Sequence, residues 1–429
     1  MKKIIIFCLC FIPMVIWAQN TNEIESAYKS YDFEKVILLT DNHCDSACVM
    51  TRINSLKALN RYNQAIDELN ALSCKDSTNL TYCVGLAECY KLINNNLKAA
   101  ELYNKAKCIN PNNRYFLLQK IKSLIIAEKN DSAISACHEW LSKDTISAIG
   151  YKYLGLAYEN NQNIPYDFIS YSMAYRRDST DNMVVMHIAN IFNNNKQYDD
   201  AISITEKYRL KDTTNLSINR QNARAYCLKG DYKNAIKRYE SLKLAGDNSA
   251  STYYYLGLSY YGDNWFYGAY ENLIKAVEKS PNDVNILYYL AKSCVRTSWK
   301  KDGEEYMERA VEVTVPTDST MIWLYKGLID CYGYSQNATK KVEVMKMLFN
   351  INKDYSLLNK IADIYYYKKD YNNAISFYER YMASVPKDMR YTKLNENGEK
   401  QDNVTTKYLE AERKIKKIKA ENFFKNNKK

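Results

Sequence analysis

Apolar residues recur along this chain at helical spacing, and the same arrangement returns every 34 residues. In the unit that begins at Ala250, the residues Tyr253, Leu256 and Tyr260 are three or four positions apart and therefore share one helical face. A second apolar run follows, and Pro281 ends it because proline cannot continue a helix. Each unit is thus predicted to be a pair of helices, and the alternation typical of strands is absent from the sequence.

This pattern keeps its phase from Ser46 to Pro316. Position 1 of successive units falls at Ser46, Leu80, Arg114, Ala148, Asn182, Leu216, Ala250 and Val284. Position 20 is small in most units and is occupied by Ala65, Ala99, Ala133, Asp167, Ala201, Ala235, Ala269 and Gly303. Small residues let paired helices approach closely, and a period of this length is typical of a solenoid in which each unit buries its neighbour's apolar face. The segment 318–354 is three residues longer than the period, so its register stays open, and a further unit begins at Tyr355.

The residues within one unit carry a known signature. With Tyr in place of Trp and Leu in place of Phe, the unit at Ala250 matches the patterns W-x2-L-G-x2-Y and A-x3-F through Tyr253, Leu256, Gly257, Tyr260, Ala269 and Leu273. The chain therefore resembles the tetratricopeptide repeat family. The resemblance implies an all-α fold, an α-solenoid formed by a right-handed superhelix of about ten tetratricopeptide-like helical hairpins with a C-terminal capping helix.

The N-terminus has the pattern of a secretory signal peptide. Lys2 and Lys3 precede the apolar run Ile4–Trp17, and a cleavage site precedes Gln19. The apolar run is shorter than the roughly 20 residues that cross a bilayer. We therefore expect residues 1–18 to be removed and the mature protein to be exported, soluble, and periplasmic or envelope-associated.

The remaining boundaries follow from changes in composition. The expected segments are an N-terminal cap or shortened repeat at 19–45, the repeat array at 46–388, a polar loop at 389–403 and a basic C-terminal capping helix at 404–429. The last helix has Tyr408, Ala411, Ile415 and Ile418 on one face. We favour a helix that closes the last repeat, because solenoids need such a cap. The alternative is a basic helix that contacts anionic lipid or an acidic partner.

Charge gives little support to a nucleic-acid partner. The net charge is +11, of which residues 388–429 contribute +5 through 12 basic and 7 acidic side chains. Lys2 and Lys3 leave with the signal peptide, so the repeat body keeps only +4, which is ordinary for its length. We expect no nucleic-acid partner.

Catalytic motifs are absent from the sequence. The three histidines, His43, His138 and His187, occupy unrelated repeat positions, and no glycine-rich phosphate loop, nucleophile elbow or H-E-x-x-H motif occurs. We therefore expect no enzyme activity, no catalytic residue, no cofactor and no metal site.

Ten cysteines remain after the signal peptide. Cys83, Cys137 and Cys294 fall on packing positions and are expected to be buried. In an oxidising compartment Cys44 could pair with Cys48, or Cys74 with Cys108, and spacing alone leaves these alternatives open.

Asp followed by Ser or Thr recurs near the turns between units. The motif begins at Asp45, Asp76, Asp131, Asp144, Asp178, Asp212 and Asp318. It resembles the acceptor motif of a general O-glycosylation pathway found in some bacteria. We favour the simpler interpretation that these residues cap helices and form turns.

The repeat register predicts a binding surface on the first helix of each unit. Positions 2, 5, 6, 9, 12 and 13 are not used in packing, and the family resemblance implies that they line a concave groove. The candidate binding residues at these positions are Asn190, Arg220, Arg224, Tyr254, Tyr255, Tyr261, Tyr288, Tyr289, Lys292 and Arg296. Tyrosine offers rigid apolar area with a polar tip, which suits contact with a peptide or a sugar.

The function expected from this surface is protein–protein interaction. A scaffold of this kind would capture an extended protein or peptide segment, with tyrosine giving area and arginine selecting an acidic segment or a C-terminal carboxylate. The alternative is a glycan-binding or envelope-transport accessory protein that uses the same aromatic groove. A third interpretation is a structural adaptor that binds through the opposite face.

We expect protein isolated from its native cell to begin near Gln19 and to fractionate with the cell envelope, because the preceding basic and apolar stretch has the form of a cleaved signal. N-terminal sequencing and intact-mass spectrometry measure this directly. Cytoplasmic protein that retains Met1 would contradict export. The same mass spectrum tests the Asp-Ser/Thr motif, since a mass equal to that of the bare mature chain excludes an attached glycan.

Overall fold

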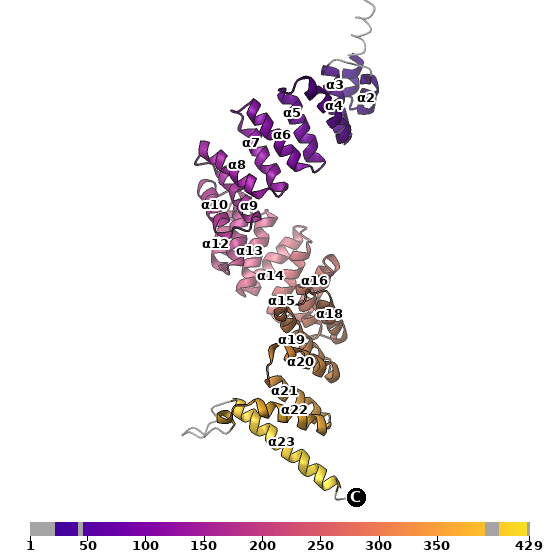
Figure 1. The fold of residues 1–429 in the computed structure, drawn as a ribbon, viewed down its shortest axis with the longest axis vertical. Coiled ribbons are helices and arrows are strands. Elements are labelled where there is room, and N and C mark those ends of the chain that lie inside the picture. Colours follow the sequence, from indigo (N-terminus) through magenta and orange to yellow (C-terminus); the bar gives the residue numbers. More distant parts are fainter. Residues whose placement is uncertain (1–21, 42–45, 391–402, 427–429) are drawn as a thin grey trace, which may run out of the picture. The chain divides into compact units, whose positions relative to one another are not determined.

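The structure is a computed structural model that describes residues 22–41, 46–390 and 403–426. Within these ranges it consists of α-helices, one 3-10 helix and connecting turns, with no strand. The chain forms two compact units, Met1–Ile191 and Phe192–Lys429, which are described separately. The predicted all-α solenoid of helical hairpins is confirmed in each of them (Figure 1).

The first unit is a series of helical hairpins, each packed against the next (Figure 1). It contains a helix over 22–29, followed by α2 (Phe33–Thr40), α3 (Ser46–Ala58), α4 (Tyr62–Lys75), α5 (Leu80–Leu92), α6 (Asn96–Ile109), α7 (Arg114–Ile126), α8 (Asn130–Lys143), α9 (Ala148–Asn160), α10 (Ile164–Arg177) and most of α11 (Asn182–Asn194). The expected signal peptide lies outside the described residues, as do His43 and Cys44.

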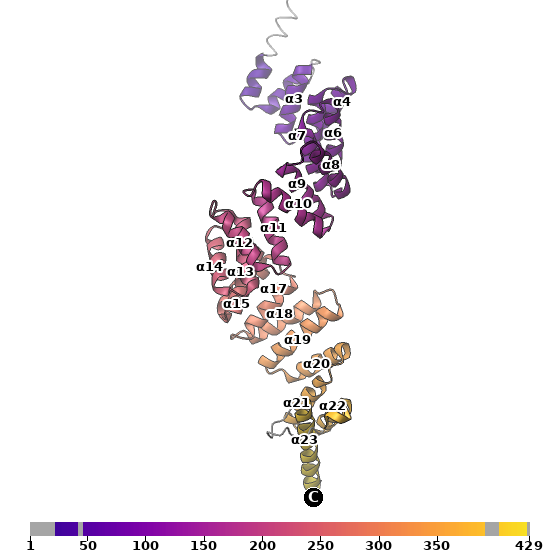
Figure 2. The ribbon, with the colours of Figure 1, turned by 90° about the vertical axis from the view of Figure 1, so that its left-hand side faces the viewer.

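The second unit begins within α11 and is likewise a series of helical hairpins. Figure 2 shows its hairpins from a second side. Its further helices are α12 (Tyr198–Arg209), α13 (Leu216–Lys229), α14 (Tyr232–Leu244), α15 (Ala250–Gly262), α16 (Phe266–Lys279), α17 (Val284–Cys294), α18 (Lys300–Glu312), α19 (Asp318–Tyr334), α20 (Ala338–Asn352), α21 (Ser356–Tyr367), α22 (Tyr371–Ser384), the 3-10 helix η1 (Lys387–Met389) and α23 (Asn403–Asn426). The longer unit whose register was open owes its length to α19, which has 17 residues where α15 has 13.

The first helix of each hairpin from α3 to α17 begins at position 1 of the repeat. A polar residue just before position 1 often caps the helix, because its side-chain oxygen accepts a hydrogen bond from a first-turn N–H that has no helical partner. The caps of this kind are Asn79, Asn113, Ser147, Asn215, Ser249 and Asp283. In the turn that precedes such a helix, Asp76, Asp178 and Asp212 each accept hydrogen bonds from the backbone N–H and the hydroxyl of the threonine two residues later. These contacts agree with the turn-forming interpretation of the Asp-Ser/Thr motif.

A residue in the left-handed conformation turns the chain inside each hairpin. It occupies position 15 in seven successive units, with φ between 55° and 86°, and these residues are Asn60, Asn94, Glu128, Gln162, Lys196, Gly230 and Asn264. The following N–H then reaches back into the first helix, as from Asn95 to the Tyr90 carbonyl at 2.8 Å, which is the long-range bond of a Schellman motif. Only Gly230 is a glycine, so the other six side chains sit in a conformation that L-residues rarely adopt.

Small residues at position 20 bring the two helices of a hairpin together. The alanines at this position are fully buried, and Gly303 is buried as well. Asp167 is the exception: it is only 4% exposed, and burial raises the pKa of its carboxyl. A close approach also involves Gly257 at position 8 of α15, where a Cβ atom would lie 2.6 Å from Leu273 Cγ and 3.2 Å from the Ala269 carbonyl oxygen. The hairpin of α15 and α16 therefore requires glycine at that point.

The helix α23 packs against α22 at the end of the second unit (Figures 1 and 2). Its predicted apolar face is buried in a core shared with α20, α21 and α22 through Tyr408, Ala411, Ile415 and Ile418. Lys414 Nζ lies 2.6 Å from Asp363 Oδ1 on α21. These contacts are those that a capping helix needs, whereas nothing in them favours the lipid-binding alternative. The side chains of Phe423 and Phe424 lie outside the described residues.

The free thiols among the described residues include Cys74, Cys83, Cys89, Cys108, Cys137, Cys227, Cys294 and Cys331. Cys83, Cys137 and Cys294 are buried as predicted, and burial raises the pKa of each thiol. Cys74 and Cys108 are exposed and unbonded, so the structure does not contain the disulfide considered for them. In the described part of the chain, no helix combines the length and apolar character needed to cross a membrane.

Gly257→Ala is expected to lower the free energy of unfolding by roughly 1–2 kcal/mol, because overpacking outweighs the gain in helix propensity. Gly85→Ala is the matched control: its Cβ would lie 3.3 Å from Leu69 Cδ2, the end of a flexible side chain, so stability should be unchanged or slightly raised. Thermal unfolding followed by circular dichroism measures both. Equal stability of the two variants would contradict the close approach.

Candidate functional site

The five predicted tyrosines lie side by side on α15 and α17, the first helices of neighbouring hairpins. The ring of Tyr254 is centred 4.9 Å from that of Tyr255 and 6.3 Å from that of Tyr289. Tyr289 in turn lies 5.7 Å from Tyr261 and 5.2 Å from Tyr288. The indole of Trp323 on α19 stacks on Tyr288 at 4.2 Å and extends the row to a third hairpin. We call this set the aromatic strip, and it consists of Tyr254, Tyr255, Tyr261, Tyr288, Tyr289 and Trp323.

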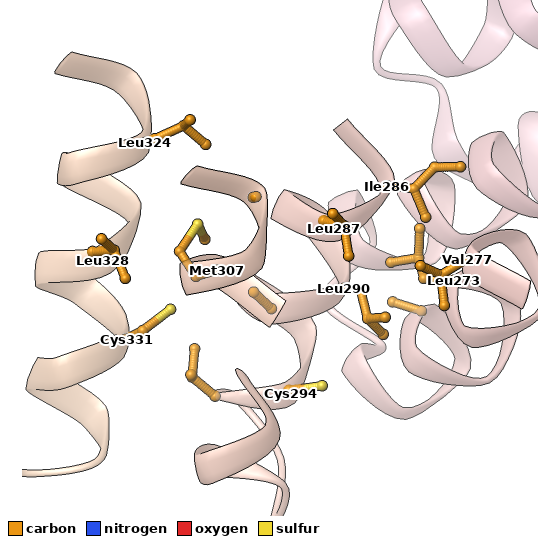
Figure 3. Packing of buried hydrophobic residues seen from close by; sticks show 14 of the residues in the cluster. Leu273, Val277, Ile286, Leu287, Leu290, Cys294, Met307, Leu324, Leu328 and Cys331 are labelled. Carbon is orange, nitrogen blue, oxygen red and sulfur yellow. The ribbon is translucent and has the colours of Figure 1, made fainter. Parts of the chain in front are cut away.

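The aromatic strip rests on a buried core formed by α16, α17, α18 and α19 (Figure 3). Figure 3 shows Leu287 and Leu290 of α17 between Leu273 of α16 and Met307 of α18. All strip residues except Tyr255 pack against this core, and every ring of the strip is half-buried. The tyrosines are therefore less exposed than their register positions suggested, because they pack on one another. Burial also raises the pKa of Tyr254, Tyr288 and Tyr289, which keeps these phenols neutral.

Arg220 on α13 forms an ion pair inside the second unit. Its Nε donates to Asp247 Oδ2 at 2.5 Å, and the Asp247 side chain is only 2% exposed. The same carboxylate accepts hydrogen bonds from the Thr252 hydroxyl at 2.8 Å and from the Ser249 N–H at 3.2 Å. Burial alone would raise the pKa of Asp247, but these hydrogen bonds lower it to about 2. The charge of Arg220 is thus balanced within the protein.

The other predicted cations differ in their surroundings. Arg224 donates from Nη2 to Asn194 Oδ1 at 2.8 Å, and its guanidinium lies 5.8 Å from the Tyr255 ring centre. Lys292 Nζ lies 2.5 Å from Asp330 Oδ2; burial alone would lower the pKa of Lys292, but this carboxylate raises it. Arg296 is exposed, and its guanidinium lies 5.1 Å from the Phe266 ring and 5.4 Å from the Tyr334 ring. Arg296 is therefore the predicted cation most open to a ligand.

The structure brings most of the predicted residues together. The five tyrosines and the four cations all belong to the second unit. Asn190 lies on α11 within the first unit, where it is half-buried, and it is described apart from them.

Three contributors were missed by sequence reasoning. Trp323 is the sixth residue of α19, and the register of that unit was open, so its repeat position was not assigned. Asp247 was not singled out because it lies outside the groove positions, and Asp330 was not because it lies in the unit whose register was open. An acidic residue 27 positions after Arg220 is no signal by itself, since the period of the repeat does not favour that spacing.

A hollow of about 400 Å³ opens beside one end of the aromatic strip. Tyr254 and Tyr255 form its aromatic wall. Its polar lining includes Ser251, Ser280, Asp283 and Asn285. The hollow thus combines flat apolar faces with hydroxyl, amide and carboxylate groups.

Comparison with known proteins agrees on the kind of repeat. The family model described as the anaphase-promoting complex, cyclosome, subunit 3 matches residues 229–310. This range extends from the last residue of α13 into α18 and holds the 34-residue period described above. The repeats are of the tetratricopeptide type.

Several solved structures are similar to the chain. A tetratricopeptide repeat protein from Parabacteroides merdae is 12% identical, with 58% of this chain and 97% of that chain covered and a TM-score of 0.45. The C-terminal part of a repeat-containing protein from Cytophaga hutchinsonii is 17% identical, with 55% and 96% covered and a TM-score of 0.41. The Cut9–Hcn1 hetero-tetramer of the anaphase-promoting complex is 12% identical, with 90% and 88% covered and a TM-score of 0.43. No curated protein matches the sequence. The repeat period and helix boundaries, rather than these scores, carry the assignment.

Asp247→Asn is expected to lower the free energy of unfolding by about 2 kcal/mol at pH 7, because the ionised carboxylate is stabilised by Arg220 and two further donors. Folding lowers the pKa of Asp247 from 3.8 to about 2, so its contribution is complete above about pH 4 and is lost as the pH falls through 2. In urea unfolding, the difference in the free energy of unfolding between wild type and Asp247→Asn should therefore shrink as the pH is lowered from about 4 to 2.

The matched control for this experiment is Asp199→Asn. Asp199 pairs with Lys229 at 2.6 Å, but its side chain is 81% exposed. Its removal should change stability by less than about 0.5 kcal/mol at any pH. If both variants lose the same stability, the buried pair has no special role.

Proposed function

We propose that the mature protein is an exported scaffold that binds an extended segment of a partner polypeptide along the aromatic strip. The continuity of six rings across three neighbouring hairpins carries this proposal. Each hairpin adds a further part to the same surface, so successive residues of an extended polypeptide can bind successive hairpins. The basic and apolar N-terminal stretch supports export.

The packing of the strip suits it to binding. Because each ring contacts its neighbours and the core beneath, little side-chain entropy is lost when a ligand covers it. Tyrosine and tryptophan also supply apolar area together with a hydrogen-bonding tip. These are the residue types that dominate binding energy at protein interfaces.

Charge has a smaller part in this proposal than the sequence suggested. Arg220 and Lys292 are balanced by Asp247 and Asp330, so neither offers an unpaired charge to an anionic ligand. Arg296 is the cation that faces solvent beside the strip. An acidic residue or C-terminal carboxylate of the partner is therefore expected near Arg296, with only a modest dependence of affinity on salt.

A glycan is the second candidate ligand. The hollow beside Tyr254 and Tyr255 favours it, because serine hydroxyls, Asn285 and Asp283 can bond sugar hydroxyls while the rings stack on the sugar face. This ligand would occupy one end of the strip rather than its whole length.

A photoreactive benzoyl-phenylalanine at position 289 is expected to cross-link a partner protein in the envelope of living cells, whereas the same group at position 367 is not. Tyr367 on α21 is the matched control, because it is a tyrosine that is 75% exposed but lies outside the strip. Mass spectrometry of the cross-linked product identifies the bound segment. Equal cross-linking at both positions would remove the strip as the binding surface.

The affinity for the identified segment then tests the residues themselves. Tyr288→Ala should weaken binding by at least about tenfold, and Arg296→Ala should weaken it less and only at low salt. Competition by oligosaccharides but not by the peptide segment would favour the glycan instead.

A further inference from the structure

A second hollow, of about 410 Å³, lies in the first unit between α6, α7 and α8. Its volume is within the range of about 300–1,000 Å³ that small-molecule sites occupy. The apolar part of its lining includes Ala100, Leu124 and Ala136. Its polar part includes Asn104, Lys120 and Glu139. The hollow lies in a different unit from the aromatic strip and shares no residue with it.

Lys120 occupies a position that normally belongs to the core. Position 7 of the first helix is apolar and buried in most units, where the residues are Leu86, Leu154, Ile188, Leu256 and Leu290. Lys120 is half-buried there, and its Nζ donates to Asn104 Oδ1 at 3.0 Å. Burial, reinforced by the neighbouring charge of Lys107, lowers the pKa of Lys120. The ammonium group is thus held by a neutral amide in a partly desolvated place.

The first repeat shows how the same chain balances a cation at position 7. There Arg52 lies 2.5 Å from Glu68 Oε1 and 2.7 Å from Asp41 Oδ1. Glu68 stands at position 23, and the equivalent residue in the unit of Lys120 is Ala136. The carboxylate that balances Arg52 is therefore replaced by a methyl group that lines the hollow.

The carboxylates that line the hollow already form ion pairs with other lysines. Glu139 accepts hydrogen bonds from Lys107 Nζ at 2.8 and 3.0 Å, one to each oxygen. Glu101, also in the lining, pairs with Lys98 at 2.8 Å. Both acidic side chains of the lining thus form their ion pairs with other lysines. Glu139 also attracts Lys120 electrostatically, but the hydrogen bond of Lys120 goes to the neutral amide of Asn104.

We propose that this hollow binds a carboxylate group carried on a short apolar chain. The carboxylate meets Lys120 and the amide group of Asn104, and the apolar chain covers Ala100, Leu124 and Ala136. A ligand carboxylate supplies the negative charge that Glu68 supplies in the first repeat. The carboxylate can come from the end of a polypeptide or from a free acid, since both present the same chemistry.

Titration of the full-length mature protein with hexanoate tests the proposal without any substitution. Hexanoate should bind saturably, and 13C NMR of the lysine Cε groups should show the pKa of Lys120 rising, because an adjacent carboxylate favours the charged ammonium. Hexanamide has the same shape without the charge and should bind at least about tenfold more weakly. Equal binding of the two compounds, or no saturable binding of hexanoate at tens of millimolar, would overturn the proposal.

Variants on α7 locate the site. Lys120→Leu restores the residue type of the other units and should reduce hexanoate affinity at least about tenfold, whereas Lys120→Arg should keep it within about threefold. Lys122→Leu, which removes a lysine two positions along the same helix, should leave the affinity unchanged. Equal loss in the Lys120→Leu and Lys122→Leu variants would contradict a specific site.

A pair of peptides distinguishes the two sources of the carboxylate. A peptide that ends in leucine with a free C-terminus and binds more tightly than hexanoate identifies a polypeptide end, provided that its amidated form does not bind. Binding of hexanoate without binding of the peptide identifies a free acid. Either result supports the proposal. The hollow at Lys120 is remote in sequence from the aromatic strip. A negative result for hexanoate therefore does not contradict the proposed function, and a negative result at the strip does not contradict the carboxylate site.

Discussion

The close approach of two helices within each hairpin is the contact on which the rest of this structure depends. A buried small residue at position 20 lets the second helix lie against the first, and a left-handed residue at position 15 returns the chain at the required place. Since a hairpin cannot bury both of its faces alone, each one must pack on the next. Stability, spacing of side chains and the position of any binding surface all follow from this local geometry.

Both proposed sites arise where particular repeats depart from the residue pattern that the other repeats share. In the second unit, aromatic residues occupy the groove positions of neighbouring first helices, and they pack into a continuous strip above an ordinary apolar core. In the first unit, Lys120 stands where most repeats have a buried Leu or Ile, and its side chain lines a hollow. Repetition makes such departures informative, because the equivalent residue in a neighbouring repeat serves as an internal reference.

The sequence was sufficient for the fold and for much of the candidate surface. Helix starts could be predicted because the period fixes them and because Asn, Ser and Asp cap them. The clustering of the five tyrosines could be predicted because helical geometry determines which positions face the groove. The partners of Arg220 and Lys292 could not be predicted, since Asp247 and Asp330 reach them across turns and between helices at spacings that no period imposes. Trp323 was missed because four added residues in α19 hide its register.

The left-handed turns determine how a chain of this kind can change in length. Position 15 accepts Asn, Glu, Gln, Lys and Gly, yet the second helix starts two residues after it in all seven units. One inserted residue would rotate everything after it by about 100° around the helix axis and expose the alanine at position 20. A substitution in these turns is therefore expected to change stability little, whereas an insertion is expected to destabilise the hairpin. Arrays of this type therefore change in length by whole hairpins. The number of repeats then sets the length of an extended ligand that the array can bind.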